Sequence, residues 1–173
     1  MAEPEREDDV VTITSMPFEI GSLSQLVVRT DTGAVASFSG TTRDNFGGKR
    51  VLRLEYEAYE PMAVLEIRRI CAAARARWDL RVIAVTHRTG LVPVGEPSIE
   101  IAISSPHRRD ALEAVHFAID ELKATVPIWK KEVYQEDSPA SEGSVGDSAG
   151  HAAAWKANAE WRAASAPSGH DLS

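Results

Sequence analysis

The fold is decided by residues 98–134, which read SIEIAISSPHRRDALEAVHFAIDELKATVPIWKKEVY. Isoleucines alternate with other side chains over 98–104, and this period of two predicts a strand. Apolar side chains then recur every three or four positions, which predicts a helix over about 110–125 with a buried stripe of Leu112, Val115, Ile119, Leu122 and Val126. Pro127 ends this helix, because the residue before a proline avoids helical backbone angles. Alternation returns over 128–134 and predicts another strand.

The same two periods recur earlier in the chain. Spacings of three and four predict a helix over 61–78. A short helix capped by Ser22 is expected over 22–29, a loop over 40–50 and a connecting turn region over 91–97. Alternation predicts strands over four further stretches, residues 10–15, 34–39, 51–58 and 80–87. The expected fold class is therefore α+β, a single domain with a mixed or antiparallel sheet packed with two long helices.

Composition separates this domain, residues 10–136, from the two ends of the chain. Residues 1–9 are acidic and polar, and we expect a disordered N-terminus. Half of residues 137–150 are serine or glycine, which is typical of a flexible loop. Residues 151–173 form a C-terminal tail that we expect to be mobile alone and to dock on the domain or on a partner. Its Ala-rich residues 151–166 favour a helix.

Charge and hydropathy exclude several classes of function. Lys and Arg number 19 and Asp and Glu 26 in 173 residues, which gives a formal net charge of −7. A net acidic surface argues against broad binding to nucleic acid or anionic membranes, but it is compatible with a small local cluster of cations. The acidic start is unlike a secretory signal and no apolar run reaches the roughly 20 residues of a membrane span, so we expect a cytoplasmic location.

Metal and disulfide chemistry are not expected. The one cysteine, Cys71, can form neither an intramolecular disulfide nor a Cys-rich zinc site, and its place in the 61–78 stripe predicts a buried, inert thiol. The five histidines are scattered without ligand spacing, so no metal site is predicted. His116 and Asp120, four residues apart, are expected to be a structural pair.

Candidate chemistry begins with two groups of cations. Arg43 lies in the glycine-containing 40–50 stretch. His107 and Arg108 lie just before the 110–125 helix, where free backbone N–H groups and the helix dipole favour an anion. An alternative for the second group is that Arg108 and its neighbour Arg109 are solvated or paired with acidic side chains of the helix, Asp110 and Glu113.

Two lysines complete the candidates. Lys123 follows the stripe residue Leu122 and so borders the buried face, where loss of solvation lets a lysine act as a base or nucleophile. The alternative is that its stem lies on the core while its amine reaches water. Lys130 shares a strand face with Ile128 and Glu132, and the alternative for it is a solvated sheet face.

Several blocks of sequence form a family pattern. In order, they are FSGTTRDNFGGKRVLRLEYEAYEPMA (38–63), HRTG (87–90), SPHRRDALEA (105–114), ELKATVPIWKKEVY (121–134) and WKANAEW (155–161). Through these blocks the chain resembles the family of large, catalytic subunits of molybdopterin synthase. The resemblance extends over most of the chain from residue 10 to residue 161.

The resemblance implies a sulfurtransferase. Members form a homodimer in which each subunit binds a small ubiquitin-like sulfur-carrier subunit with a C-terminal Gly-Gly thiocarboxylate, so that the assembly is a heterotetramer. Two sulfurs pass to cyclic pyranopterin monophosphate and give the dithiolene of molybdopterin. The resemblance implies no metal and no other cofactor for this step.

The resemblance also implies roles for individual residues. Lys123 matches the lysine beside the partner's C-terminal carbonyl, and Lys130 matches the second essential lysine. Arg43 matches a pocket arginine, and His107 and Arg108 match a pair that binds the pterin and its phosphate. We expect Lys123 to move the proton and Lys130 to orient substrate and stabilise charge, and these two roles are interchangeable.

Two other functions stay open at this point. A non-catalytic paralogue would bind the ubiquitin-like partner without chemistry, and it would need the groove but not all five cationic residues. An unrelated phosphate-ester enzyme would use the His107-Arg108 anion site, and it would leave Lys123 and Lys130 without a role.

Overall fold

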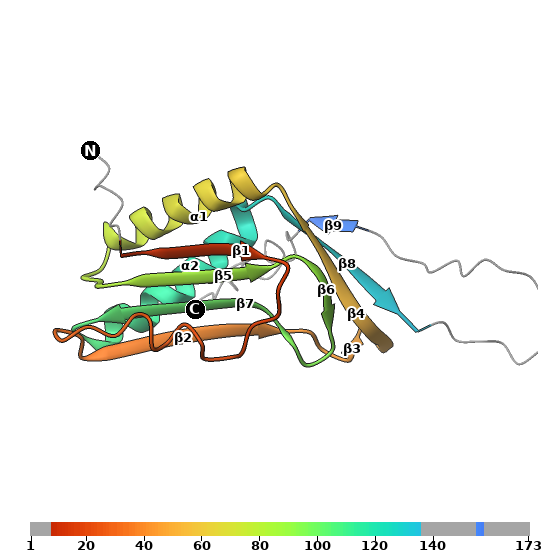
Figure 1. Ribbon diagram of the computed structural model, residues 1–173, viewed down its shortest axis with the longest axis horizontal. Helices are drawn as coiled ribbons and strands as arrows, with labels where there is room; N and C mark the ends of the chain where they lie inside the picture. Colours follow the sequence, from red (N-terminus) through yellow and green to blue (C-terminus); the bar gives the residue numbers. More distant parts are fainter. Residues whose placement is uncertain (1–7, 136–154, 158–173) are drawn as a thin grey trace, which may run out of the picture.

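The computed structural model describes residues 8–135 and the backbone of residues 155–157 (Figure 1). The described elements are, in chain order, β1 (Val10–Thr14), β2 (Ala34–Thr41), β3 (Asn45–Phe46), β4 (Lys49–Ala58), α1 (Glu60–Arg75), β5 (Ile83–Arg88), β6 (Gly90–Pro93), β7 (Pro97–Ser105), α2 (Arg108–Thr125), β8 (Ile128–Tyr134) and β9 (Trp155–Ala157). The α+β class with two long helices is confirmed. No helix in the described part is long and apolar enough to cross a membrane.

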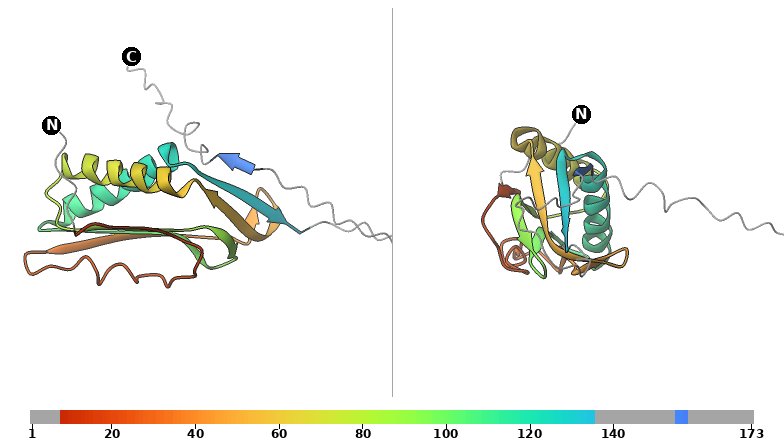
Figure 2. Two further views of the ribbon diagram at one scale, coloured as in Figure 1. Left: turned by 45° about the horizontal axis from the view of Figure 1, so that its top comes forward. Right: turned by 90° about the vertical axis from the view of Figure 1, so that its right-hand side faces the viewer.

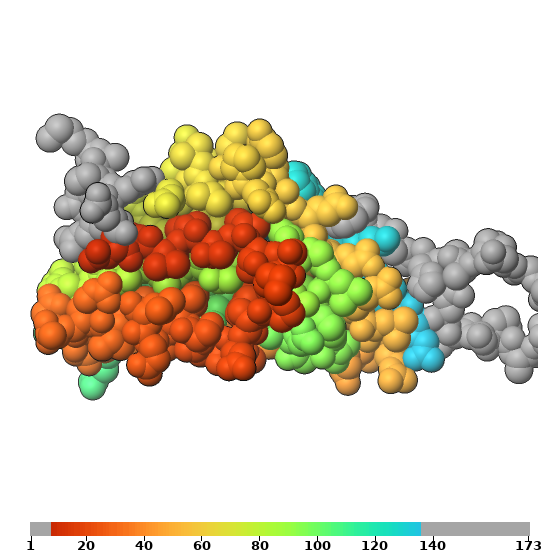
Figure 3. Space-filling view, viewed as in Figure 1, coloured from red at the N-terminus to blue at the C-terminus, as the bar shows by residue number. Residues whose placement is uncertain are grey.

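The first sheet is mixed and has the order β1-β5-β7-β2. β1 pairs with β5 in parallel, and β7 pairs antiparallel with both β5 and β2. Both helices lie on one face of this sheet (Figure 2), and the segment between β1 and β2 covers the opposite face (Figure 3). Every residue of β5 and β7 is consequently buried.

The segment that covers this sheet is not the helix expected over 22–29. It consists of turns in which backbone N–H groups donate to carbonyls three residues back, and the expected cap, Ser22, donates its hydroxyl to Glu100 instead (3.0 Å). The Gly21 N–H donates to the other oxygen of Glu100 (2.8 Å). Glu100 is a fully buried carboxylate of β7, and a buried carboxylate needs such donors. Turns place two donors on it, which the expected helix would not.

Helix α2 is placed as predicted, and four of its five predicted stripe residues are buried: Val115, Ile119, Leu122 and Val126. The prediction is wrong for Leu112 alone. Leu112 is 62% exposed. The buried face combines three alanines with three larger side chains, Ala111, Ala114, Val115, Ala118, Ile119 and Leu122. The alanines let the backbone of α2 lie close to β2 and β7, which turns Leu112 outward.

The second sheet is built around β4, which pairs antiparallel with β3, β6 and β8. The expected loop over 40–50 is only partly right, because this stretch contributes residues to β2, β3 and β4. The turn expected within 91–97 is present at 94–95, where it connects β6 to β7, although residues 91–93 belong to β6. Gly47 and Gly48 connect β3 to β4 with φ values of 58° and 79°. Two successive positive φ values are the requirement of a tight hairpin turn, and glycine meets it without strain.

Strand β9 adds to the free edge of β8. Its backbone pairs antiparallel with β8, with residue 156 opposite Lys130. Residues 155–157 are therefore strand rather than the expected helix. The expectations for residues 1–7, 136–154 and 158–173 lie outside the described residues.

Candidate functional site

A cavity of about 530 Å³ lies where the two sheets meet the C-terminal end of α2. Its walls come from β2, the turn after it, β3, β4, β5, β7, α2 and β8. The lining residues are Phe38, Ser39, Gly40, Thr41, Arg43, Asn45, Phe46, Val51, Leu54, Tyr56, His87, Ser98, Ile99, Ile119, Leu122, Lys123, Lys130 and Glu132.

Three of the five predicted site residues, Arg43, Lys123 and Lys130, line this one cavity. The chain between the two lysines reverses direction at Val126 and Pro127, where Val126 has the extended angles (φ −75°, ψ 129°) that a following proline favours. This reversal returns β8 beside the end of α2. A cavity with three cations suits anionic ligands, even in a chain whose net charge is −7.

The three cations differ in depth. Lys123 and Arg43 are exposed in the single chain, and the Arg43 guanidinium lies over the Phe46 ring, 5.6 Å from its centroid. The Lys130 side chain is only 16% exposed, and its Nζ lies 3.3 Å from an oxygen of Glu132, whose side chain is 6% exposed. The exposed amine therefore stands at the mouth of the cavity, and the buried amine lies inside it.

Glu132 holds Lys130 in place. The Tyr134 hydroxyl donates to the second oxygen of Glu132, so this buried carboxylate has partners on both oxygens. The predicted alternation of β8, with Lys130 and Glu132 on one face, is confirmed. The alternative of a solvated face is wrong for these two residues, because both side chains are largely buried.

Sequence reasoning assigned no role to His87 and Tyr56, which lie at the bottom of the cavity. The two rings pack edge to face with centroids 5.2 Å apart, and they bring together β5 of the first sheet and β4 of the second. Burial raises the pKa of Tyr56, so its hydroxyl stays protonated. The HRTG block marks His87 in the sequence, but a single histidine at the end of an apolar strand has no spacing pattern that predicts a site.

Burial also lowers the pKa of His87 to about 4. An unfolded chain protonates this histidine near pH 6.5, whereas the folded chain excludes the proton down to about pH 4. The unfolded state binds more protons in this window, so the free energy of unfolding falls as the pH is lowered through it. At about 1.4 kcal/mol per pKa unit, the loss contributed by His87 approaches about 3 kcal/mol.

Urea unfolding between pH 7 and pH 4 measures this loss. We expect the free energy of unfolding of His87→Phe to depend less on pH than that of the wild type. His116→Ala, which removes an exposed histidine, is the matched control and should follow the wild type. Parallel curves for wild type and His87→Phe would contradict the prediction.

The remaining predicted site residues, His107 and Arg108, lie at the other end of α2. Both are exposed, and Arg108 has no ion pair among the described residues. Arg108 and Lys123 are fifteen positions apart, which corresponds to about 22 Å of helix. One chain therefore does not bring this pair to its own cavity.

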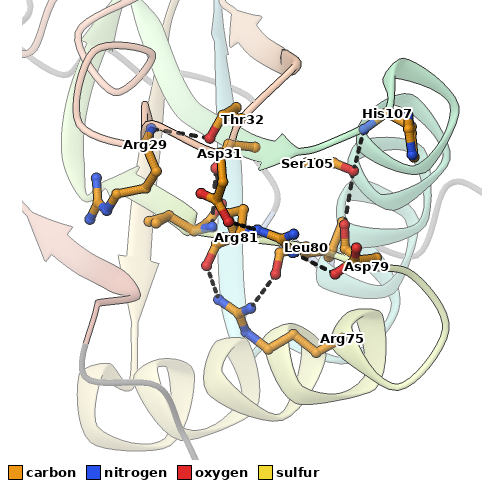
Figure 4. Close-up of polar contacts among 11 residues, drawn as sticks. Arg29, Asp31, Thr32, Arg75, Asp79, Leu80, Arg81, Ser105 and His107 are labelled. Atoms are coloured by element: carbon orange, nitrogen blue, oxygen red, sulfur yellow. Dashed lines mark hydrogen bonds and ion pairs between the residues drawn. The ribbon is translucent and has the colours of Figure 1, made fainter.

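A polar network fixes the backbone at His107 (Figure 4). The buried Ser105 hydroxyl accepts from the His107 N–H (3.1 Å) and donates to the Asp79 carbonyl (2.8 Å). Arg81 forms an ion pair with the Asp79 carboxylate (2.5 Å). At Gly33, a Cβ would lie 2.2 Å from the Pro106 carbonyl oxygen, so only glycine allows this close approach. The network fixes where His107 leaves the sheet, and its side chain stays exposed.

The other candidate groups have structural surroundings. Arg109 pairs with Glu113 (2.7 Å), which confirms that part of the alternative, and His116 Nε2 lies 3.5 Å from Asp120. Cys71 is buried as predicted, and burial raises the pKa of its thiol to about 12. Within residues 8–135, no group of three or more His, Cys, Asp or Glu side chains is arranged to hold a metal ion.

Comparisons with known proteins give one family. The family model described as MoaE protein matches residues 13–125. The "Molybdopterin synthase catalytic subunit" of Bos taurus is 56% identical over 134 residues, which cover 78% of this chain and 71% of that protein. The crystal structure of molybdopterin synthase from Staphylococcus aureus matches with a TM-score of 0.70 and 32% identity, over 83% of this chain and 94% of that chain. A chain from the complex of subunits 1 and 2 of the Helicobacter pylori molybdopterin-converting factor shares the fold (TM-score 0.59, 19% identity, 72% and 84% covered).

Proposed function

Since the chain belongs to the MoaE protein family, we propose that it is the catalytic subunit of a molybdopterin synthase. In this proposal it transfers sulfur from the C-terminal thiocarboxylate of a small ubiquitin-like subunit to cyclic pyranopterin monophosphate. Two transfers give the dithiolene. In each transfer the bond between the acyl carbon and sulfur is hydrolysed, and water supplies the oxygen that leaves the partner with an ordinary carboxylate. A cytoplasmic location remains a prediction from the sequence.

The observation that carries the proposal is the convergence of Arg43, Lys123 and Lys130 on one cavity. A thiocarboxylate and a cyclic phosphate are both anions and repel each other in water. Fixed cations in a cavity partly shielded from water offset this repulsion and stabilise the charge that moves during transfer. A binding module that only docks the partner has no need of a buried amine such as that of Lys130.

The depths of the two lysines support different roles. Lys123 stands at the mouth, where the partner's C-terminus enters, and there it is placed to move a proton as sulfur leaves the acyl carbon. Lys130 is oriented by Glu132, and in this proposal it fixes the substrate and stabilises negative charge. Arg43 at the rim adds a bidentate donor for an anionic group.

His107 and Arg108 enter the proposal from a second copy of the chain. They lie about 22 Å along α2 from Lys123, so within one chain they serve no common cavity. In a twofold homodimer the exposed N-terminal end of α2 of one protomer reaches the cavity of the other. Each dimer then has two identical cavities, and each cavity is completed by both chains.

Reconstitution tests the proposed function. The purified dimer, a thiocarboxylated ubiquitin-like subunit and cyclic pyranopterin monophosphate are mixed, and product is followed by mass spectrometry. We expect a product with two added sulfurs and two partner molecules converted to the carboxylate for each product. A complex that assembles without forming product would instead support the non-catalytic paralogue.

A further inference from the structure

The bottom of the cavity is made of neutral polar groups, in contrast to the cations at its mouth and wall. His87 of β5, Tyr56 of β4 and Ser98 of β7 all line it. None of the roles proposed above uses them. All three are buried in the single chain, so they face a ligand only through the cavity.

The imidazole of His87 has a defined tautomer. Its Nδ1 lies 2.9 Å from the backbone carbonyl oxygen of Arg88, and a carbonyl only accepts hydrogen bonds. Nδ1 therefore carries the hydrogen, and Nε2 carries the lone pair. Within residues 8–135, no side chain or backbone group hydrogen-bonds to Nε2. Because His87 lines the cavity, its ring presents this acceptor to a ligand there.

Neighbouring groups keep this acceptor neutral and fixed. Tyr56 packs edge to face against the ring, and Ser98 lines the same cavity beside it. The Ser98 hydroxyl donates to the Gly40 carbonyl (3.3 Å), so Ser98 is tied to the end of β2. Burial, which lowers the pKa of His87 to about 4, leaves the imidazole uncharged at neutral pH.

The two ends of this cavity favour different chemical groups of a ligand. Phosphate and thiocarboxylate groups favour the end with Arg43, Lys123 and Lys130. A neutral acceptor at the bottom repels anions and favours an N–H donor instead. The pyranopterin ring system carries N–H donors and is joined to the cyclic phosphate, so a single molecule satisfies both ends of the cavity.

We propose that Nε2 of His87 accepts a hydrogen bond from an N–H group of the pyranopterin ring, and that His87 thereby selects and orients the ring at the bottom of the cavity. This inference rests on the proposed function and adds a ring-recognition residue to it. Tyr56 is a positioning residue, because it acts by holding the imidazole in place.

Binding to the full-length homodimer without the ubiquitin-like subunit tests the inference. Isothermal titration calorimetry at pH 7.5 compares cyclic pyranopterin monophosphate with inorganic phosphate, which carries the anion but no ring. The variants are His87→Phe, which keeps an aromatic ring beside Tyr56 but removes the acceptor, and His87→Gln, which keeps an acceptor. Thr86→Val is the matched control, since Thr86 is buried on the same strand but does not line the cavity.

We expect His87→Phe to weaken binding of the pyranopterin by about 10- to 100-fold, because an N–H donor is left unpaired in a buried site. Its affinity for inorganic phosphate should equal that of the wild type. His87→Gln should recover much of the affinity for the pyranopterin, and Thr86→Val should bind both ligands as the wild type does.

Two outcomes would overturn this inference without overturning the proposed function. One is equal pyranopterin affinity of wild type and His87→Phe, and the other is a parallel loss of phosphate affinity, which would place the effect on the anion and not on the ring. A wild-type dimer that makes the dithiolene in either case leaves the proposed function intact. A wild type that binds no pyranopterin overturns the proposed function, and the inference with it.

Discussion

Replacement of Lys123 by alanine is expected to lower the rate of dithiolene formation by about 1,000-fold or more, while the complex with the ubiquitin-like subunit still assembles. Lys123 is exposed at the end of α2, so its loss leaves the core of the chain unchanged. The effect therefore falls on the reaction, where proton movement and charge stabilisation at the mouth of the cavity are both removed.

Two measurements on the same preparation separate a loss of reaction from a loss of partner binding. One is the rate of product formation in a single turnover, and the other is the dissociation constant of the partner. Lys131→Ala is the matched control, because Lys131 is the neighbour of a cavity lysine, contacts Glu55 (3.7 Å) and does not line the cavity. Lys123→Arg keeps the positive charge, but arginine hardly releases a proton. If Lys123 moves a proton, product formation by Lys123→Arg should be as slow as that by Lys123→Ala. Near-normal turnover by Lys123→Ala would remove Lys123 from the reaction.

Mixing two inactive variants is expected to restore activity. Lys123→Ala and Arg108→Ala homodimers each lack one essential group in both cavities. In a mixed dimer one cavity has both defects and the other has none, because Lys123 and Arg108 of one cavity come from different chains. After random exchange of subunits half of the dimers are mixed, so about one quarter of the wild-type rate should return.

The experiment is done by denaturing and refolding the two variants together, with each refolded alone as the control. If both residues of a cavity came from one chain, every cavity would keep one defect, and the mixture would remain as slow as its components. That result would contradict the shared cavity, although the loss of activity in each variant would still stand.

Local periodicity was sufficient to predict the helices and strands whose apolar residues repeat on one buried face. Strand β7 and helix α2 were predicted within a few residues, since the isoleucines of one and the apolar spacing of the other reflect a single buried face. Leu112 was misplaced because the spacing of large side chains does not show that the alanines of α2 pack closest to the sheet. The turns over 22–29 were missed because their cause, the buried Glu100, lies far along the sequence.

The site was predicted only in part, and for similar reasons. Arg43, Lys123 and Lys130 were matched through sequence blocks, but their common cavity depends on how two sheets meet. The distance that separates His107 and Arg108 from them follows from the length of one helix. His87 was overlooked because its significance depends on a tautomer and on the ring of Tyr56, and neither can be derived from spacing.

The burial of Cys71 has a consequence for the route of sulfur. This is the one thiol of the sequence, it is closed off in the core, and with a pKa of about 12 it is not a thiolate at neutral pH. Only a thiolate takes up sulfane sulfur as a persulfide or reacts readily with alkylating agents. In the proposed reaction the chain therefore has no thiol on which to store sulfur, so each sulfur passes directly from donor to acceptor, and we expect iodoacetamide to leave the activity unchanged.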